Sequence, residues 1–391
     1  MMQISPETQL FIREHSSDDV RVLALQAKKY PDIDMPTAIT QIAGRKVAAE
    51  KIPSWWEIEK IWYPKHLSLE QCSSEITARY KARLLQGDSL TDLTGGFGID
   101  CSFLATGFKS ATYVERQEEL CEIAAHNFPV LNLNHINIKN EDGVTYLQVM
   151  SPVDCLFLDP ARRNEHGGKT VAISDCEPNV AELEELLLQK ANRVMIKLSP
   201  MLDLSLALKE LKQTQEVHIL SVNNECKELL ILLGQTSPAE ISIHCVNLFT
   251  KGTQKEQHFV FTREQEQCSE CTYTDSLETY LYEPNASLLK AGAFRSIAAA
   301  YPVRKLHPNS HLYTSDTFIE NFPGRIFRIV NQCSFNKKEV KENLADLKKA
   351  NVTVRNFPAT VAELRKRIHL AEGGDLSLIH ISEPTRLGMI S

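Results

Sequence analysis

The sequence predicts an α/β protein, and two features lead to this prediction. Between about residues 89 and 234, short apolar segments alternate with segments of helical periodicity, which is typical of a parallel sheet covered by helices on both faces. A glycine-rich turn at residues 95–98 follows the first apolar segment, and a later one ends in Asp159-Pro160. Both lie where a Rossmann-like sheet binds its ligands, beyond the carboxyl ends of its strands. We therefore expect a Rossmann-like seven-stranded sheet, preceded by an N-terminal helical domain and followed by a small C-terminal α+β domain.

Length and composition restrict the class of protein. A chain of 391 residues is too long for one ordinary domain, and 43% hydrophobic residues are enough for sizeable cores. The formal net charge of −7 gives no global reason to bind nucleic acid or a membrane. The sequence begins without a signal-peptide pattern, no apolar run approaches the roughly 20 residues of a spanning helix, and the ten cysteines follow no disulfide framework. We therefore expect a cytoplasmic protein that does not contact membranes.

Residues 1–85 are expected to form the helical N-terminal domain, because apolar residues recur there at helical spacing. Three tryptophans follow these stripes, at Trp55, Trp56 and Trp62. We interpret them as residues that pack this domain onto its neighbour, since an apolar stripe on a helix usually marks a core. A surface on which a substrate stacks is the alternative.

Residues 86–272 are expected to form the central domain with a trailing β-hairpin. Its strands are expected at 89–94, 111–115, 136–140, 153–159 and 194–198, and its helices at 98–106, 117–128, 179–191 and 204–212. Strands 217–222 and 229–233 follow without a helix between them, so we expect a closing hairpin that adds an antiparallel strand at one edge. The trailing hairpin pairs 241–248 with 258–262.

Residues 273–375 are expected to form the α+β domain, with one helix at 286–299 and another at 337–349. Residues 321–370 carry a net charge of +7, so the rest of the chain carries −14. Clustered basic residues beside aromatic ones are typical of nucleic-acid-binding segments, and a solvated helix face is the simpler interpretation. This region is our candidate for contact with RNA.

Residues 376–391 are expected to be a non-native tail. The segment 377–386, SLIHISEPTR, resembles a translated sequencing adapter. We therefore expect the natural sequence to differ after about residue 375, and we derive no function from the tail.

The turn after the first strand is a candidate cofactor site. The glycines of residues 95–98 let the backbone pass close to a ligand. Glu115 ends the next strand, at a position where a carboxylate can accept from both hydroxyls of a ribose. The layout resembles a dinucleotide site, but Cys101 stands where the third glycine of that fingerprint belongs, and Asp92 repels phosphate. S-Adenosylmethionine fits these acids better, because it carries an amino group and a sulfonium but no phosphate.

The third strand is followed by Asp142, which can accept from the amino group of an adenine. The alternative is a helix N-cap with Gly143 beginning the helix, and one carboxylate can serve both roles. The candidate cofactor-binding residues are Asp92, Thr94, Gly95, Gly96, Gly98, Glu115, Asp142 and Asp159.

These motifs together resemble a known family. Residues 92–98, Glu115, Asp142 and 159–162 resemble the successive motifs of class I S-adenosylmethionine-dependent methyltransferases, over about residues 89–234. The segments SSEITARYKARLL, LTDLTGGFGIDCSFLA, FLDPARR, IKLSPMLD and YLYEPNASLLKAGAF resemble a bacterial group of these proteins with a C-terminal THUMP-like domain. The resemblance implies S-adenosyl-L-methionine as cofactor. Because THUMP domains accompany RNA-modifying enzymes, it also implies an RNA substrate.

Asp159 is the first candidate for a catalytic residue. Methyl transfer from a sulfonium requires an aligned nucleophile, and an amine nucleophile benefits from a hydrogen-bond acceptor such as this carboxylate. Asp-Pro-Ala-Arg lacks the aromatic residue of the amino-methylating pattern Asp/Asn-Pro-Pro-aromatic, which argues against methylation of a base nitrogen. It is closer to the Asp-Pro-Pro-Arg of some RNA carbon methylators, which use a cysteine. Cys176 is the nearest such residue, and an ordinary loop thiol is its simpler interpretation.

Arg162 and Lys197 complete the candidate catalytic set. Arg162 and Arg163 begin a loop over 162–169, where they form either a phosphate or substrate clamp or an exposed surface pair. Lys197 ends an apolar strand and therefore needs a partner, which Asp159 or the substrate could supply.

The sequence thus predicts an S-adenosylmethionine-dependent methyltransferase that modifies a base in structured RNA, such as tRNA or rRNA. Two alternatives stay open: a methyltransferase that acts on a protein or a small molecule, which the overall acidity favours, and a non-catalytic binding module built on the cofactor fold. We expect no metal site, because Cys268-x-x-Cys271 lacks a second pair of ligands.

Overall fold

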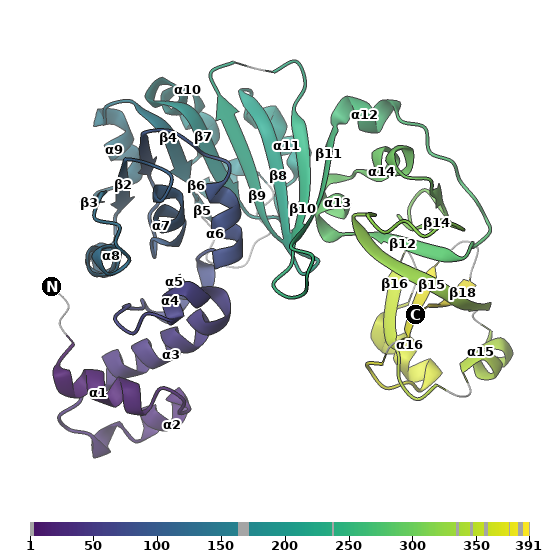
Figure 1. Ribbon diagram of the computed structural model, residues 1–391, viewed down its shortest axis with the longest axis horizontal. Coiled ribbons are helices and arrows are strands. Elements are labelled where there is room, and N and C mark those ends of the chain that lie inside the picture. The colour runs from purple at the N-terminus through teal and green to yellow at the C-terminus, as the bar shows by residue number, and fades with distance from the viewer. Residues whose placement is uncertain are drawn as a thin grey trace. The chain divides into compact units, whose positions relative to one another are not determined.

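The structure is a computed structural model, shown in Figure 1. It describes residues 4–162, 172–236, 238–333, 336–344, 347–355, 359–374, 376–381 and 386–390. The chain divides into two units, which we describe separately. The first comprises Met1–Val217 and Glu228–Ala239, and the second comprises His218–Lys227 and Glu240–Ser391. The domain boundaries expected from the sequence stay a prediction.

The first unit begins with helices, as the sequence predicts. They are α1 (Pro6–Glu14), α2 (Val20–Leu25), α3 (Met35–Lys51), α4 (Pro53–Trp56), α5 (His66–Gln71) and α6 (Glu75–Ala82), with a 3₁₀ turn at Ala27–Lys29. Ser5, Asp19 and Asp34 cap three of them by accepting from backbone N–H groups that the first helical turn leaves unpaired. The first helices enclose a core of their own around Phe11, Leu23 and Ile42.

A second core joins these helices to residues 97–131, which include the end of the glycine turn and two helices that follow it. Trp55 and Tyr63 are buried in one cluster with Phe97 and Ile99, and the rings of Trp55 and Phe97 meet edge to face with centroids 5.2 Å apart. The packing role predicted for Trp55 is therefore confirmed. Trp56 is instead exposed, with the guanidinium of Arg45 5.7 Å from its ring centroid.

Parallel strands form the centre of the first unit. They are β1 (Ser89–Asp92), β2 (Ser110–Glu115), β3 (Ile136–Asn140), β4 (Val153–Leu158) and β7 (Ala191–Leu198), in the order β3-β2-β1-β4-β7. The helices between them are α7 (Ile99–Ala105), α8 (Glu118–Val130), α9 (Gly143–Val149) and α10 (Val180–Lys190), and α11 (Leu204–Glu210) follows β7. The last four residues of β4 are buried, as expected for a parallel strand covered on both faces. The predicted Rossmann-like sheet is confirmed.

The closing strands differ from the prediction in their place. β9 (Glu225–Gly234) runs antiparallel to β7, with Leu230 opposite Lys197, and β8 (Thr214–Val222) lies beyond it. The antiparallel strand therefore lies between β7 and β8. A hairpin sequence alone does not say which of its two strands pairs with the preceding strand of the sheet, because both are apolar.

The loop after β4 also differs from the prediction. Ala161–Arg162 (β5) pairs with Cys176–Glu177 (β6) in a short antiparallel ribbon. The rest of the loop expected at 162–169 lies outside the described residues.

The second unit contains a hairpin and a separate sheet. β10 (Ser242–Leu248) pairs antiparallel with β11 (Glu256–Thr262), followed by α12 (Arg263–Cys268), so the trailing hairpin is present. The seven-stranded sheet has the order β13-β14-β12-β15-β18-β17-β16. Its strands are β12 (Tyr280–Pro284), β13 (Arg304–Lys305), β14 (Tyr313–Ser315), β15 (Gly324–Cys333), β16 (Asn351–Arg355), β17 (Ser377–Ile381) and β18 (Arg386–Ile390), and its helices are α13 (Ala286–Ala291), α14 (Phe294–Ala300), α15 (Lys337–Leu344) and α16 (Val361–Ile368).

The single helix expected at 286–299 is wrong. Gly292 ends α13 in the left-handed conformation, with φ of 76°, and a new helix begins at Phe294. β17 and β18 lie in the suspected tail, whose origin stays a prediction. In the part of the chain that the structure describes, every helix is too short or too polar to cross a bilayer.

Candidate active site

The glycine turn connects β1 to α7 and lies tightly against β2. A Cβ on Gly95 would come within 2.2 Å of the Tyr113 ring, so this position excludes every side chain. Gly98 is the N-cap of α7 and has a φ of 85°, which strongly favours glycine. The Tyr113 hydroxyl donates to the carbonyl of Gly96. Tyr113 was missed by sequence reasoning, although it fixes the path of the turn.

Glu115 ends β2 and contacts the same turn. Its Oε2 accepts from the backbone N–H of Gly96 and its Oε1 from that of Gln117, both at 2.8 Å. The side chain of Asn140, at the end of β3, donates to the Glu115 carbonyl. Each carboxylate oxygen has two lone pairs, so Glu115 retains the capacity to accept from a diol.

Asp92 ends β1 and is almost completely buried, with 1% of its surface exposed. Its Oδ1 accepts from the N–H of Thr94 at 3.0 Å, whereas its Oδ2 has no hydrogen-bond partner in the described part of the chain. Burial raises the pKa of this carboxyl to about 8, and the negative charges of Asp100, Asp159 and Glu115 act in the same direction. A buried carboxyl oxygen without a partner is costly, so this position favours a ligand that brings a cation or a donor.

Asp142 is the N-cap of α9. Its Oδ1 accepts from the N–H groups of Val144 and Thr145 at 3.1 and 3.0 Å. The capping interpretation is therefore confirmed, and the adenine contact stays a prediction.

Asp159 follows β4 directly and contacts both the turn after β1 and strand β7. Its backbone N–H donates to Thr94 Oγ1 at 2.6 Å, and its Oδ2 forms an ion pair with Lys197 Nζ on β7. Burial raises the pKa of Asp159, and the Lys197 ammonium partly offsets this. Burial alone would lower the pKa of Lys197, but Asp159 and further carboxylates raise it above its usual value. The carboxylate partner expected for Lys197 is thus Asp159.

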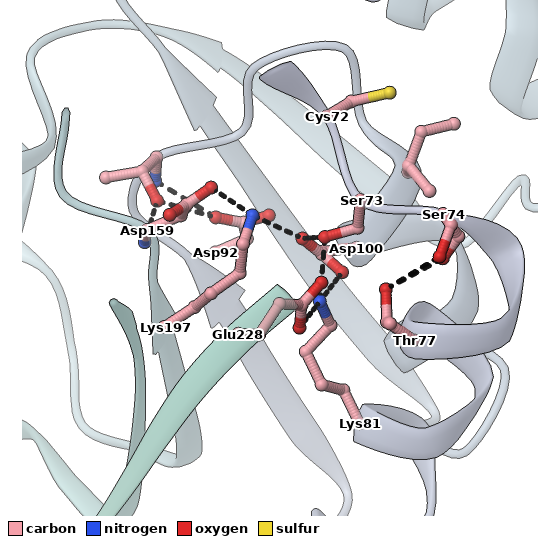
Figure 2. A network of polar contacts seen from close by, with 12 residues as sticks. Cys72, Ser73, Ser74, Thr77, Lys81, Asp92, Asp100, Asp159, Lys197 and Glu228 are labelled. Carbon is pink, nitrogen blue, oxygen red and sulfur yellow. Dashed lines mark hydrogen bonds and ion pairs between the residues drawn. The ribbon is translucent and has the colours of Figure 1, made fainter. Parts of the chain in front are cut away.

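Lys197 belongs to a larger network of buried charges that sequence reasoning missed (Figure 2). Its Nζ lies 3.6 Å from Asp100 Oδ2, and Asp100 Oδ1 lies 2.8 Å from the Nζ of Lys81 on α6. Lys81 Nζ also lies 2.7 Å from Glu228 Oε2 on β9 and donates to Ser73 Oγ at 2.7 Å. The sequence contains only a weak signal of this network. Lys81 lies in a partly apolar helix, Asp100 lies beside the glycine turn, and Glu228 precedes the apolar run of β9.

The remaining candidates are placed less completely. Arg162 lies in β5, but its side chain and all of Arg163 are outside the described residues. Cys176 lies in β6 and is buried. Burial raises the pKa of the Cys101 thiol well above its usual value, so the residue that replaces the third glycine acts as a packing residue.

The basic segment lies in the second unit. Phe322 is buried among Tyr282, Tyr301 and Tyr313, so it belongs to the core, and Phe335 and Phe357 lie outside the described residues. The exposed basic residues of the segment are Arg325, Arg328, Lys338, Lys341, Lys348, Lys349, Lys366 and Arg367. The side chain of Lys337 is not described.

Comparison with known proteins places this geometry in a family. A THUMP domain-like model matches residues 324–382 and a ferredoxin-like domain model matches residues 280–323. The chain is 33% identical to a putative methyltransferase from Porphyromonas gingivalis W83 of known crystal structure, with 100% of this chain and 98% of that chain covered and a TM-score of 0.86. No curated protein matches the chain.

Other solved structures are more distant. A modification subunit of a putative type I restriction enzyme from Vibrio vulnificus YJ016 is 12% identical over 51% of this chain and 56% of that chain, with a TM-score of 0.36. An rRNA methylase from Streptococcus thermophilus is 15% identical over 41% of this chain and 93% of that chain, with a TM-score of 0.30. Similarity at this level carries no argument about function.

The strand order and the glycine turn after β1 define a class I methyltransferase fold. The chain belongs to the family of the putative methyltransferase from Porphyromonas gingivalis W83, and in this chain the fold is followed by the THUMP-like match.

Proposed function

We propose that the protein is an S-adenosylmethionine-dependent methyltransferase that modifies a base in structured RNA. The proposed cofactor rests on the Oδ2 of Asp92, which is buried beside the glycine turn and has no hydrogen-bond partner among the residues that the structure describes. An amino group or a sulfonium brings a cation to this oxygen and stabilises the ionised form of Asp92, whereas a pyrophosphate brings neither a cation nor a donor. The first unit therefore favours an adenosyl sulfonium over a dinucleotide.

The charges around Asp92 point in the same direction. Among the described residues, the three carboxylates of the network, Asp100, Asp159 and Glu228, face two buried ammonium groups, Lys81 and Lys197. The net charge of these five groups is therefore negative even while Asp92 is protonated, and a cationic ligand would neutralise it. Glu115 would hold the ribose and Asp142 the adenine, with Thr94 and Gly96 supporting the turn.

Asp159 would orient the acceptor. The cofactor supplies an electrophilic methyl group, and the protein must align a nucleophile with it. Because Lys197 holds Asp159 as a carboxylate, Asp159 suits the role of a hydrogen-bond acceptor for an N–H of the acceptor. Arg162 stands where the amino-methylating pattern has the aromatic residue that would stack on a base, so any stacking comes from elsewhere. Arg162 stays a candidate for a phosphate contact.

The RNA part rests on the second unit. Exposed lysine and arginine residues gather in the segment 321–370, which overlaps the THUMP-like match. Such a cluster binds phosphates through counterion release, which makes the affinity depend steeply on salt. None of the ten cysteines, which all lie in the described part of the chain, forms a disulfide, and this agrees with the proposed cytoplasmic location.

The test of the proposal uses tritiated S-adenosylmethionine with total RNA, total protein and the small-molecule fraction of a bacterial lysate, each analysed separately. We expect tritium in the RNA fraction with the parent protein and incorporation slower by about a hundredfold or more with Asp159→Asn. Label confined to protein or small molecules would replace the RNA substrate by the second candidate, which the overall acidity favours. Absence of label in every fraction would favour a non-catalytic binding module.

RNA binding is tested separately by a triple variant, Lys338→Gln, Lys348→Gln and Lys349→Gln. We expect weaker retention on RNA and a smaller slope of affinity against salt, by about one unit for each phosphate that the variant no longer neutralises. The matched control neutralises the exposed Lys65, Lys109 and Lys212 of the first unit. Equal retention of both triple variants would contradict RNA binding through this segment.

A further inference from the structure

A line of alternating charges connects α6 to Asp159. In order, the charged groups are Glu228, Lys81, Asp100, Lys197 and Asp159, and each contacts the next through an ion pair. Figure 2 shows Lys81 between Glu228 and Asp100, and Lys197 between Asp100 and Asp159. The N-terminal helices therefore reach the carboxylate at the end of β4 through two lysines.

Ser73 fixes the geometry at the start of this line. Its hydroxyl accepts from Lys81 Nζ and donates to Asp100 Oδ2, both at 2.7 Å. Asp100 is thus held on one side by Ser73 and Lys81, which leaves Lys197 at a longer distance of 3.6 Å and able to approach Asp159. Ser73 and Lys81 belong to the segment SSEITARYKARLL, for which the proposed function provides no role.

The fold alone does not require this arrangement. Lys81 has no exposed surface, and removing two or more charges from water is costly even when they are paired. Apolar side chains of similar volume are often at least as stable as a buried ion network. In this line the first four charged groups are buried and the fifth is the candidate catalytic carboxylate. Such a line is better explained by what it does to that carboxylate.

We propose that Lys81 and Ser73 are positioning residues, which act through Asp100 and Lys197 to hold the Asp159 carboxylate in the orientation that the methyl acceptor requires. The inference rests on the proposed function and deepens it, because it makes the N-terminal helices part of the reaction centre. Lys81 pairs with Asp100, and this pairing prevents Asp100 from drawing Lys197 away from Asp159.

Loss of Lys81 would change the protonation of Asp159 in a defined direction. Among the side chains that the structure describes, the charged and titratable groups around Asp159 are Lys197 on β7, Asp92 on β1, Asp100 on α7, Lys81 on α6, Glu228 on β9 and the nearby Cys72 thiol. Without Lys81 the remaining charge is more negative and Lys197 shifts toward Asp100. Both effects raise the pKa of Asp159, so the acid limb of the pH–rate profile would move to higher pH.

The experiment compares Lys81→Met with the double variant Lys81→Met/Glu228→Gln, which removes one charge of each sign, and with Ser73→Ala. The matched control is Lys51→Met, because Lys51 lies in the same N-terminal helices and bonds to the backbone carbonyls of Leu69 and Glu70. We expect Lys81→Met and the double variant to slow single-turnover methyl transfer at least tenfold and shift the acid limb upward, with cofactor affinity within threefold of the parent. Ser73→Ala should show a smaller loss, and the control should match the parent.

The double variant separates positioning from folding. It removes the Glu228 charge that would destabilise Lys81→Met once its lysine partner is gone, so it should regain stability without regaining rate. Parental rate and an unshifted acid limb in either folded variant would overturn the inference. A rate that recovers in the double variant together with the melting temperature would also overturn it, because the role of Lys81 would then be structural.

A measurement that does not depend on methyl transfer tests this inference separately from the proposed function. Aspartate ¹³Cγ NMR, with Asp159 assigned by its loss in Asp159→Asn, follows the titration of Asp159 directly. An upward shift of the Asp159 midpoint in Lys81→Met supports the network even if no acceptor is methylated. An unchanged midpoint contradicts the network even if the parent is an active methyltransferase.

Discussion

Each unit of the molecule buries a charge network, and the two are built differently. In the second unit Glu283 on β12 is buried between Arg325 and Arg355, whose side chains stay 47% and 31% exposed. In the first unit the two lysines are buried together with Asp100 and Glu228. In the second unit, therefore, the main cost of desolvation falls on one carboxylate, whereas in the first it falls on groups of both signs.

The difference separates a structural clamp from a candidate reaction centre. Glu283 pairs with Arg325 across neighbouring strands and with Arg355 from β16, so it ties the parts of one sheet together. The network of the first unit instead ends at Asp159, beside the unpartnered oxygen of Asp92. A stabilising role explains the first arrangement, and the second requires a function that makes use of buried charge.

The largest expected effect is the loss of activity in Asp159→Asn. This variant keeps the shape of the side chain but removes the charge that accepts from the methyl acceptor. We expect kcat to fall by about a hundredfold or more, the usual scale for a lost proton acceptor, with cofactor affinity little changed. Methyl transfer from labelled cofactor and calorimetry measure the two quantities, and parental transfer rates would remove Asp159 from the mechanism.

In the second unit, we expect Glu283→Gln to lower stability and to leave cofactor binding unchanged, in contrast to Asp159→Asn. We expect a loss of about 2 kcal/mol in stability, because two arginines lose a buried counterion, and no change in cofactor affinity. Hydrogen exchange of peptides from β12 and β15 measures the local loss, with the exposed Glu225→Gln as control. Weaker cofactor binding in Glu283→Gln would break the distinction between clamp and reaction centre.

A smaller effect is the pH dependence of cofactor binding through Asp92. Its pKa of about 8 means that the free protein holds this carboxyl mostly protonated at neutral pH. A bound cation stabilises the ionised form, so binding releases a proton, and affinity rises by up to about tenfold per pH unit until about pH 8. Calorimetry in buffers of different ionisation enthalpy measures the proton. Asp92→Asn corrects for titration of the ligand itself, and equal pH dependence in parent and variant would contradict the assignment.

The smallest effect is expected at His311 in the second unit. Burial lowers the pKa of this histidine, which stacks on Phe294, to about 4. Since the unfolded chain binds the proton more readily, the second unit loses stability as pH falls below about 6.5 toward 4. Thermal unfolding of the parent and of His311→Phe between pH 7 and 4.5 checks this, with the exposed His369→Gln as control. A His311→Phe variant with the same acid sensitivity as the parent would refute the prediction.

Much of the first unit could be predicted because its signals are local. β1 to β4 and β7 fall within about three residues of their predicted bounds, since apolar runs and turns specify strands directly. The glycine turn, Glu115 and Asp159 were likewise visible as residues at strand ends. The place of β9 was not, because neighbours in a sheet depend on packing that no short segment records.

The buried network could not be predicted for the same reason. Lys81 and Glu228 are 147 positions apart, and nothing near either residue indicates that they meet. The unpartnered Oδ2 of Asp92 also depends on what surrounds it in space. Lys197 was an exception, because a lysine in an apolar strand requires a counterion and Asp159 was already expected at the neighbouring strand end.

The most direct test of the account is calorimetric titration of the purified full chain with S-adenosylmethionine, S-adenosylhomocysteine and a nicotinamide dinucleotide. The account predicts heat from the two adenosyl sulfur compounds, weakened in Asp92→Asn, and none from the dinucleotide. Uptake of the dinucleotide with no heat from S-adenosylmethionine or its demethylated product would contradict it.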